Sequence, residues 1–306
     1  MNKKIFVGLL SASLVFSGVT ADAARYFMQG ENVGSKIPYG DNLKVGKFVQ
    51  ADDAKIYYEV YGKGEPILIL HGGGVGTPYE MGKIIDELKK NHQVVLMSTR
   101  GHGHSETGHS PLTYEQKAAD ILAVVEKITD KPIQILGFSD GAYGAYKFAA
   151  MYPEKVERIA AIGAGTLKAG FFPAGGLKID ELAKFDSQFI EEQKKIRPES
   201  ENWQDFCDDY MNFWHNQSVG EEIFGKIKCP VLLIVGDEDD HAPVITVLQA
   251  HQIIPNSRLC VVPKAWHAAF LDNYEVTAAA IFPFVNAKLN DLKPSKKVEY
   301  NSQKEG

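Results

Sequence analysis

The chain has 306 residues, of which 44% are hydrophobic and 24% are charged, close to the average for globular proteins. This composition excludes a largely disordered chain, a collagen-like repeat and a small disulfide scaffold. The formal net charge of −6 argues against nucleic acid as the main partner. At about 150 residues per domain the length suggests two units, which can bury a core without help from metals or disulfides.

Residues 1–23 predict a secretory signal peptide. Two lysines precede an apolar stretch over residues 5–16, and residues 21–23 have the small-x-small pattern that signal peptidase cleaves. The apolar stretch is shorter than the roughly 20 residues needed to span a bilayer, which argues against a membrane anchor. We therefore expect an exported protein, periplasmic or extracellular, that is cut after Ala23 or Ala21 and keeps no stable membrane span.

Strand and helix patterns alternate after an N-terminal extension over residues 24–45. Partial apolar–polar alternation over residues 47–50 and 55–61 predicts an antiparallel hairpin. Residues 67–70 form a continuous apolar run, typical of a strand buried on both faces. Helix patterns follow at residues 81–88, 113–125 and 141–151. Strand patterns lie between and after them, at residues 94–97, 132–136 and 158–162.

The alternation stops over residues 167–226. This segment holds a loop rich in Gly, Phe and Pro and then helical patterns, the clearest of which carries an aromatic stripe. The stripe contains Trp203, Phe206, Cys207, Tyr210, Met211 and Trp214. Such a stripe is usually the buried face of an amphipathic helix, and it also lines a substrate pocket when the helix belongs to a lid.

Alternation then resumes up to the end of the predicted fold. The patterns are a strand at 231–235, a helix near 243–252, a strand at 259–262 and a helix near 275–289. Repeated strand–helix units imply an α/β fold, with a mostly parallel sheet and helices on both faces. We predict a core of residues 46–166 and 227–290, a helical cap over 167–226, and a polar tail over 291–306.

The three cysteines, Cys207, Cys229 and Cys260, allow at most one disulfide in an oxidising compartment. Two of them lie in or beside apolar runs, so we interpret the cysteines as small buried hydrophobic residues and leave one disulfide open. The chain contains no Cys-x-x-Cys pair, and we predict neither a metal site nor a cofactor.

The strongest signal for chemistry is the segment Gly137-Phe138-Ser139-Asp140-Gly141, between a predicted buried strand and a helix. This is the G-x-S-x-G pattern of a nucleophile elbow, in which small residues let the strand and the helix approach closely. The helix N-terminus points backbone amides at developing negative charge. Ser139 is therefore the candidate nucleophile.

A serine nucleophile needs a base and an acid on loops after late strands. Among the nine histidines, His267 follows the last predicted strand and is the candidate base. The preceding strand leads into Gly236-Asp237-Glu238-Asp239-Asp240, and one of these acids should orient the imidazole. Asp239 is our first choice, Asp240 the second and Asp237 the third, although spacing alone does not separate the three acids.

The predicted oxyanion hole needs two backbone N–H donors. One comes from the residue after the nucleophile, Asp140, and the other from a loop after an early strand. The segment His71-Gly72-Gly73-Gly74 fits that loop, because glycine lets bare backbone approach a substrate oxygen. We expect the second donor to be the N–H of Gly73, or else that of Gly74.

These segments resemble the α/β-hydrolase family over residues 47–289. The resemblance rests on His71-Gly72-Gly73-Gly74, Arg100-Gly101-His102-Gly103-His104-Ser105, Gly137-Phe138-Ser139-Asp140-Gly141, Gly236-Asp237-Glu238-Asp239 and Trp266-His267. It implies an α/β-hydrolase fold and supports Asp239, which is the last residue of a G-x-x-D turn. It also implies that His102, His104 and His109 are loop residues rather than metal ligands.

The chain departs from the family pattern at two positions. Ser98 stands where the family often has Asp, and Trp266 stands where it often has Gly before the catalytic histidine. The Ser-Asp pair of the elbow is similar to that of valacyclovir-hydrolase-like esterases. A serine at position 139 argues against epoxide hydrolases and haloalkane dehalogenases, which resemble this fold but use Asp there.

Together these residues predict a serine hydrolase that cleaves a small or medium ester or other acyl substrate through an acyl-enzyme. The residues expected to contact this small molecule are Gly74, Phe138, Trp203, Phe206, Tyr210, Trp214 and Trp266. An aminopeptidase, a lactonase or a carbon–carbon bond hydrolase would use the same triad, and a ligand sensor would keep it with little turnover. The oligomeric state stays open.

Overall fold

The structure, a computed structural model, describes residues 24–30 and 34–293. The predicted signal peptide and most of the predicted polar tail lie outside these residues, so export stays a prediction. Within the described ranges, no helix is long and apolar enough to cross a membrane.

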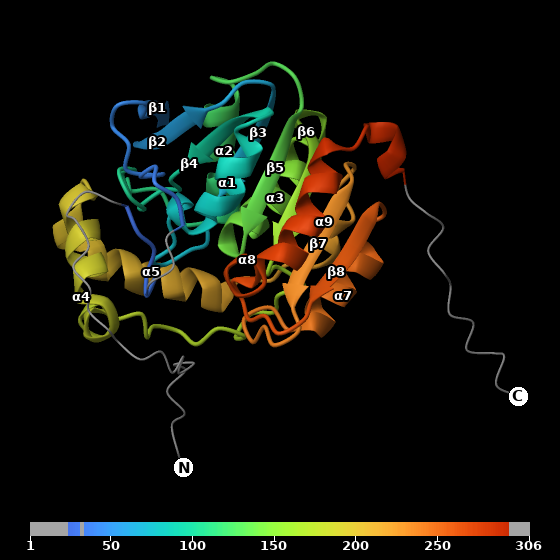
Figure 1. Ribbon diagram of the computed structural model, residues 1–306. Coiled ribbons are helices and arrows are strands. Elements are labelled where there is room, and N and C mark those ends of the chain that lie inside the picture. The colour runs from blue at the N-terminus through green and yellow to red at the C-terminus, as the bar shows by residue number, and fades with distance from the viewer. Residues whose placement is uncertain (1–23, 31–33, 294–306) are drawn as a thin grey trace, which may run out of the picture.

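An eight-stranded sheet runs through the centre of the described chain (Figure 1). In spatial order its strands are β1 (Lys47–Ala51), β2 (Ala54–Tyr61), β4 (His92–Met97), β3 (Glu65–Leu70), β5 (Ile133–Phe138), β6 (Val156–Ile162), β7 (Val231–Gly236) and β8 (Ser257–Val262). The pairings β1–β2 and β2–β4 are antiparallel, and every pairing from β4 to β8 is parallel. This topology confirms the predicted α/β class with a mostly parallel sheet.

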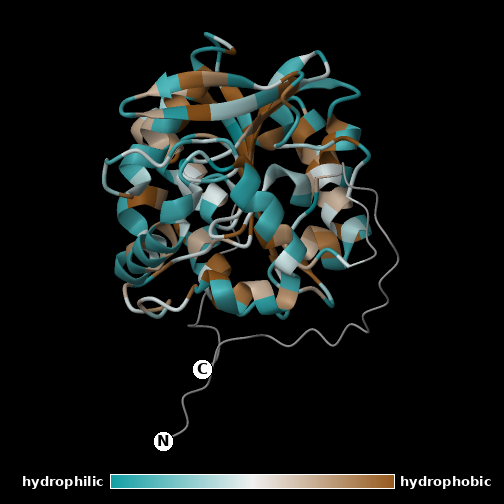
Figure 2. Cartoon of the chain, turned by 90° about the vertical axis from the view of Figure 1, so that its left-hand side faces the viewer, coloured by the Kyte–Doolittle hydropathy of each residue, from teal (hydrophilic) through white to brown (hydrophobic). Residues whose placement is uncertain are grey.

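Helices cover both faces of the sheet, and two hydrophobic clusters fill the space between the layers. The bounds are η1 (Pro78–Met81), α1 (Gly82–Leu88), α2 (Tyr114–Val125), α3 (Asp140–Met151), η2 (Pro153–Lys155), α7 (Val244–Ile253), α8 (Ala269–Asp272), α9 (Tyr274–Asn286) and η4 (Leu289–Leu292). In β3, Leu68 and Leu70 pack with α2 and α3, whereas Ile67 and Ile69 pack with α1 and α9. The strand reads as a continuous apolar run because both of its faces are covered. Figure 2 shows hydrophobic residues gathered along the central strands.

Local signals explain two further features of the core. Thr113 caps α2 as its spacing predicts, because its hydroxyl accepts a hydrogen bond from the N–H of Gln116 at 3.0 Å. Arg100 pins the loop after β4: its guanidinium contacts Asp120 at 2.8 and 2.9 Å and Asp53 at 2.6 Å. The loop is thus tied both to α2 and to the β1–β2 turn.

The segment from residue 167 to 226 lies beyond one end of the strands, where Figure 1 shows α4 and α5 together. Its helices are α4 (Ile179–Ile196), η3 (Ser200–Asn202), α5 (Trp203–Asn216) and α6 (Glu221–Phe224). The backbone of α4 is interrupted at Asp186. The Asp186 carboxylate binds Arg25 at 2.7 Å and the N–H of Met28 at 2.8 Å, which ties the N-terminal extension to this segment.

All three cysteines are free. Cys207 and Cys229 are buried, and Cys260 is half-buried. The disulfide that the sequence left open is therefore not formed in this structure.

Candidate active site

Ser139 lies at the turn between β5 and α3. Its backbone has φ +51° and ψ −119°, a strained conformation for a residue with a side chain. Glycines on both sides permit this turn: a Cβ on Gly137 would lie 2.7 Å from the Cα of Ala142, and a Cβ on Gly141 would lie 2.5 Å from the carbonyl oxygen of His71. The turn leaves Ser139 half-buried at the carboxyl edge of the sheet, where a substrate can reach it.

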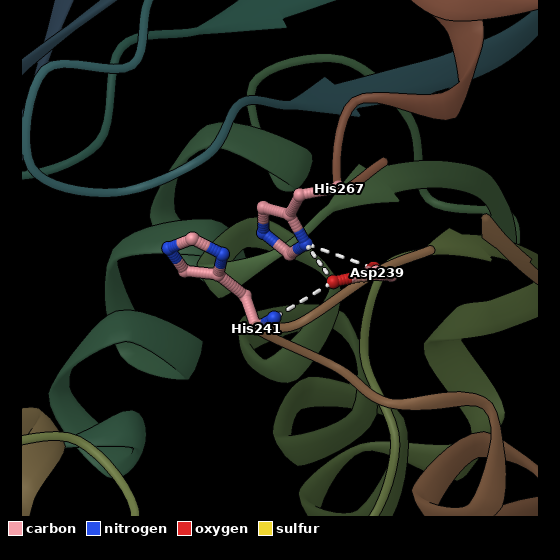
Figure 3. A group of neighbouring side chains, drawn as sticks. All are labelled: Asp239, His241 and His267. Atoms are coloured by element: carbon pink, nitrogen blue, oxygen red, sulfur yellow. Dashed lines mark hydrogen bonds and ion pairs between the residues drawn. The ribbon is translucent and has the colours of Figure 1, made fainter. Parts of the chain in front are cut away.

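Three side chains form a hydrogen-bonded chain at this edge. The Oγ of Ser139 lies 2.8 Å from Nε2 of His267. Nδ1 of His267 lies 3.0 and 2.9 Å from the two carboxylate oxygens of Asp239, as Figure 3 shows for this pair. Asp239 follows β7 and His267 follows β8, so the carboxyl ends of neighbouring parallel strands bring them to the serine. The geometry lets His267 accept the serine proton while Asp239 holds its ring.

The Asp239 carboxylate is fully buried and well supplied with donors. One of its oxygens also accepts hydrogen bonds from the N–H groups of His241, at 2.9 Å, and Ala242, at 2.8 Å. Burial alone would raise the pKa of Asp239, but the hydrogen bonds and charge of His267 and the two amides outweigh it, so the pKa lies below its usual value. Asp239 is therefore an anion that can stabilise an imidazolium.

The other two candidate acids are engaged elsewhere. Asp240 is exposed and lies 2.8 Å from Nδ1 of His241, and Asp237 is exposed and accepts a hydrogen bond from the N–H of Ala265. The turn after β7 therefore places Asp239, and neither neighbour, against His267. Spacing could not separate the three acids because all of them lie on one short turn.

His241 belongs to the site although the sequence patterns did not single it out. Its ring stacks on that of His267, with the centroids 4.7 Å apart and 24° between the planes (Figure 3). Partial burial of the half-exposed ring and the neighbouring imidazole of His267 lower the pKa of His241. A neutral His241 adds no positive charge beside His267. Its position directly after the acidic turn was the one sequence signal for it.

Asp239, His241 and His267 also form a cluster of residue types that can bind a metal ion. Asp239, His241 and His267 present ligand atoms within 4.8 Å of one another. The Asp239 oxygens and Nδ1 of His267 already bond each other, so a cation there would compete with the hydrogen-bonded chain to Ser139. The donor set thus fits proton transfer better than metal binding.

The loop after β3 is held in one orientation by a histidine. Nε2 of His71 accepts a hydrogen bond from the N–H of Thr99 at 3.0 Å, so its Nδ1–H donates to the carbonyl of Gly72 at 2.5 Å. Burial lowers the pKa of His71 to about 4, which keeps the ring neutral. Since the Gly72 carbonyl points to His71, the N–H of Gly73 in the same peptide points the opposite way.

A second group holds this loop from the other side. The N–H of Gly72 donates to Oε1 of Glu80 at 2.9 Å. Burial raises the pKa of Glu80 to about 8, and the bond from Gly72 opposes that shift. Within the described residues, the N–H groups of Gly73 and Asp140 donate to no other group, so both are free to bind a substrate oxygen.

The cap residues divide into two groups. Tyr210 and Trp214 lie over the oxyanion loop: a Cβ on Gly73 would overlap the Trp214 ring and lie 2.7 Å from Cε1 of Tyr210. Trp203, in contrast, packs on the guanidinium of Arg197, which lies 4.6 Å from its ring centroid, inside the cap. Of the predicted substrate contacts on α5, the structure therefore brings Tyr210 and Trp214 to the site and leaves Trp203 in the cap's own hydrophobic cluster.

The other predicted substrate contacts, Gly74, Phe138, Phe206 and Trp266, lie in different surroundings. Phe138 packs against His267, with centroids 5.0 Å apart, and Gly74 follows Gly73 with φ +68°. Phe206 contacts Tyr210 and the buried His102 of the Arg100 loop. Trp266 is 48% exposed, so its ring lies at the surface beside the base.

Access to Ser139 is narrowed by the loop before α4. The Phe172 ring contacts both Trp214 and His241, at centroid distances of 5.6 and 6.2 Å. A cavity of about 290 Å³ lies instead between the N-terminal extension, the Arg100 loop and α4, and no residue of the Ser139–His267–Asp239 chain lines it. The rings of Phe172 and Trp214 thus lie beside His241 and the oxyanion loop.

A mostly parallel sheet that carries a serine, a carboxylate and a histidine at the ends of β5, β7 and β8 is the arrangement of a serine hydrolase. The sequence profile described as "alpha/beta hydrolase fold" matches residues 65–189. "Serine hydrolase BPHL" of Homo sapiens is 22% identical over 76% of this chain and 84% of its own length. A "2-hydroxy-6-oxononadienedioate/2-hydroxy-6-oxononatrienedioate hydrolase 1" of Pseudomonas putida is 26% identical over 79% of this chain and 97% of its own length.

A solved structure agrees with these relatives. A serine hydrolase involved in carbazole degradation, the CarC enzyme, superposes with a TM-score of 0.67 at 20% identity, over 80% of this chain and 99% of its own. At that identity the likeness shows the fold alone. The chain has the α/β-hydrolase fold, and these matches support its assignment as a hydrolase of the α/β-hydrolase family.

Proposed function

We propose that the chain hydrolyses a small or medium carboxylic ester through a covalent acyl-enzyme on Ser139. The observation that carries this proposal is the unbroken chain of hydrogen bonds from Ser139 through His267 to Asp239, at 2.8 to 3.0 Å. A serine hydroxyl becomes a nucleophile only when a base is in position to take its proton. Here the base and its orienting anion are in place before substrate arrives.

In the proposed reaction, His267 takes the proton of Ser139 as the serine oxygen attacks the substrate carbonyl. The N–H groups of Gly73 and Asp140 bind the developing oxyanion, and Asp239 stabilises the imidazolium. His267 then protonates the leaving alcohol, and the ester bond to Ser139 remains. Water, deprotonated by His267, attacks that ester and releases the acid, which restores the serine.

The aromatic groups beside Ser139 favour an uncharged acyl group of limited size. Tyr210 and Trp214 lie against the oxyanion loop, and Phe172 packs on Trp214. Lys117, a buried cation on α2, is already paired with the Asp140 carboxylate and does not offer its charge to a substrate. A short neutral acyl chain meets both conditions.

A carbon–carbon bond hydrolase is the second candidate, because the Pseudomonas putida relative is named for such a substrate and matches over 97% of its own length. Its named substrate is a dicarboxylate, which calls for cations near the nucleophile. The pairing of Lys117 with Asp140 argues against that substrate class in this chain.

The test is labelling with a fluorophosphonate probe, followed by turnover of p-nitrophenyl esters from acetate to octanoate. We expect the probe on Ser139 and loss of turnover in Ser139→Ala, whereas Ser187→Ala, an exposed serine on α4, should behave as the wild type. Labelling of another residue, or full turnover in Ser139→Ala, would overturn the mechanism. Cleavage of a vinylogous diketone without ester turnover would favour the second candidate.

A further inference from the structure

The carboxylate next to the nucleophile has more hydrogen-bond donors than its predicted role requires. The side chain of Asp140 is 1% exposed and accepts hydrogen bonds from Tyr210 at 2.5 Å, Trp214 at 3.1 Å and Tyr114 at 3.2 Å. The ammonium of Lys117 contacts the same carboxylate. Its oxygens thus serve four donors, although the oxyanion hole uses only the backbone N–H of this residue.

These donors come from two different parts of the molecule. Tyr114 and Lys117 belong to α2 of the core, whereas Tyr210 and Trp214 belong to α5 of the cap. The two cap residues are four positions apart on one helix, so both side chains leave the same face of α5. One carboxylate therefore joins the core, the elbow and the cap.

The charge of this group is balanced locally. Burial lowers the pKa of the Lys117 ammonium, and the nearby carboxylate of Asp120 opposes that shift. The Lys117 ammonium also forms an ion pair with Asp140. An ionised Asp140 only accepts hydrogen bonds, which suits the four donors that surround it. An amide in its place would point its own N–H groups at donors.

We propose that the Asp140 carboxylate is a positioning group that anchors α5 over the oxyanion loop and so limits the size of the acyl group that fits beside Ser139. The proposal rests on the proposed ester hydrolysis for its substrate and deepens it. Tyr210 and Trp214 donate hydrogen bonds to Asp140, and their rings lie next to Gly73. The hydrogen bonds that hold α5 in place therefore also hold the aromatic wall of the acyl site.

A purely structural ion pair would make a different prediction. Loss of such a pair lowers stability and slows the turnover of every substrate alike. Loss of an anchor lets the Trp214 ring move off the oxyanion loop, which opens space for longer acyl chains and loosens the fit of short ones. The ratio of activity on short and long esters separates the two cases.

The test uses Tyr210→Phe, which removes the donor hydroxyl and keeps the ring, together with Lys117→Met. Tyr146→Phe is the matched control, because Tyr146 is also fully buried and donates to the carbonyl of Ala164 in the core at 3.0 Å. The readout is kcat/KM for p-nitrophenyl acetate divided by that for p-nitrophenyl octanoate. We expect this ratio to fall about tenfold in both variants, the scale of one lost hydrogen bond to a charged group. In Tyr146→Phe the ratio should stay at the wild-type value.

A second readout does not depend on turnover. In a background of Trp203→Phe and Trp266→Phe, Trp214 is the only tryptophan, since the chain has three. Acrylamide should quench its fluorescence more strongly once Tyr210→Phe or Lys117→Met is added. An unchanged ratio with unchanged quenching would overturn the anchor even if wild-type ester turnover is normal. Increased quenching in a protein that cleaves no ester would support the anchor and refute the proposed function instead.

Discussion

The core and the cap of this molecule are held together by different means. In the core, strands buried on both faces and glycines packed against backbone place Ser139, Asp239 and His267 within hydrogen-bonding distance. The cap is a set of amphipathic helices that packs on the core through Phe213, and its residues Tyr210 and Trp214 also donate hydrogen bonds to one carboxylate, Asp140. The reacting groups and the proposed wall of the acyl site are thus held by different parts of the molecule. The ends of the strands hold Ser139, Asp239 and His267, whereas hydrogen bonds to Asp140 hold Tyr210 and Trp214.

The largest effect is expected in the core, at the acid. Asp239→Asn should lower kcat on p-nitrophenyl esters about 10³-fold or more, because the amide favours the wrong tautomer of His267 and cannot stabilise its cation. Asp240→Asn, on the same turn but exposed, is the matched control and should change kcat by less than twofold. Equal losses in the two variants would contradict the separation of roles along this turn.

The next effect compares two glycines. A Cβ at Gly141 would lie 2.5 Å from the backbone carbonyl oxygens of Leu70 and His71, which cannot yield, so Gly141→Ala should lower the free energy of unfolding by about 1–3 kcal/mol. The three atoms nearest to a Cβ at Gly73 would belong to side chains of the cap, Tyr210 and Trp214. Gly73→Ala should therefore raise KM and cost less stability than Gly141→Ala. Urea unfolding and ester kinetics measure both, and the reverse order of stabilities would break the comparison.

The contact between Glu80 and the oxyanion loop can be tested through the pH dependence of the free energy of unfolding. Its folded pKa of about 8 lies above the ordinary value of about 4.3, so the folded state keeps a proton that the unfolded chain releases. This contribution to stability is fully present below about pH 4.3 and is lost as the pH rises to about 8. Relative to the wild type, Glu80→Gln should thus gain about 1–2 kcal/mol of unfolding free energy between pH 5.5 and 7.5. Parallel pH profiles for the two proteins, measured by chemical unfolding, would show that this carboxyl is ionised throughout.

The smallest effect is expected on the cap surface. Lys178 and Asp208 lie 2.6 Å apart, but their side chains are 50% and 37% exposed. Lys178→Ala should therefore change the free energy of unfolding by less than about 0.5 kcal/mol, with no change in ester selectivity. A loss above about 1 kcal/mol in urea unfolding would mean that surface pairs, and not only Asp140, hold the cap in place.

Sequence patterns were most informative where a local interaction decides the structure. The elbow glycines, the Thr113 cap and the continuous apolar strands each depend on neighbours within a few residues, so they could be predicted without the fold. Asp239 was the first choice among three acids and a family resemblance supported it, because spacing cannot say which carboxylate of a tight turn faces His267. Glu80 and Lys117 were missed altogether, and His241 was marked only by its place after the acidic turn. An isolated charged residue or histidine carries no pattern that shows what it will contact.

Apolar periodicity and glycine act locally, so the α/β class, the order of the strands along the chain and the residue at the strained turn could be read from the chain. Which groups meet across long separations emerged only from the folded molecule. It placed Asp239 against His267, Glu80 against the oxyanion loop, and α5 against the Asp140 carboxylate. Those contacts depend on how buried charges find partners once water is excluded, and that pairing is a property of the assembled core and cap.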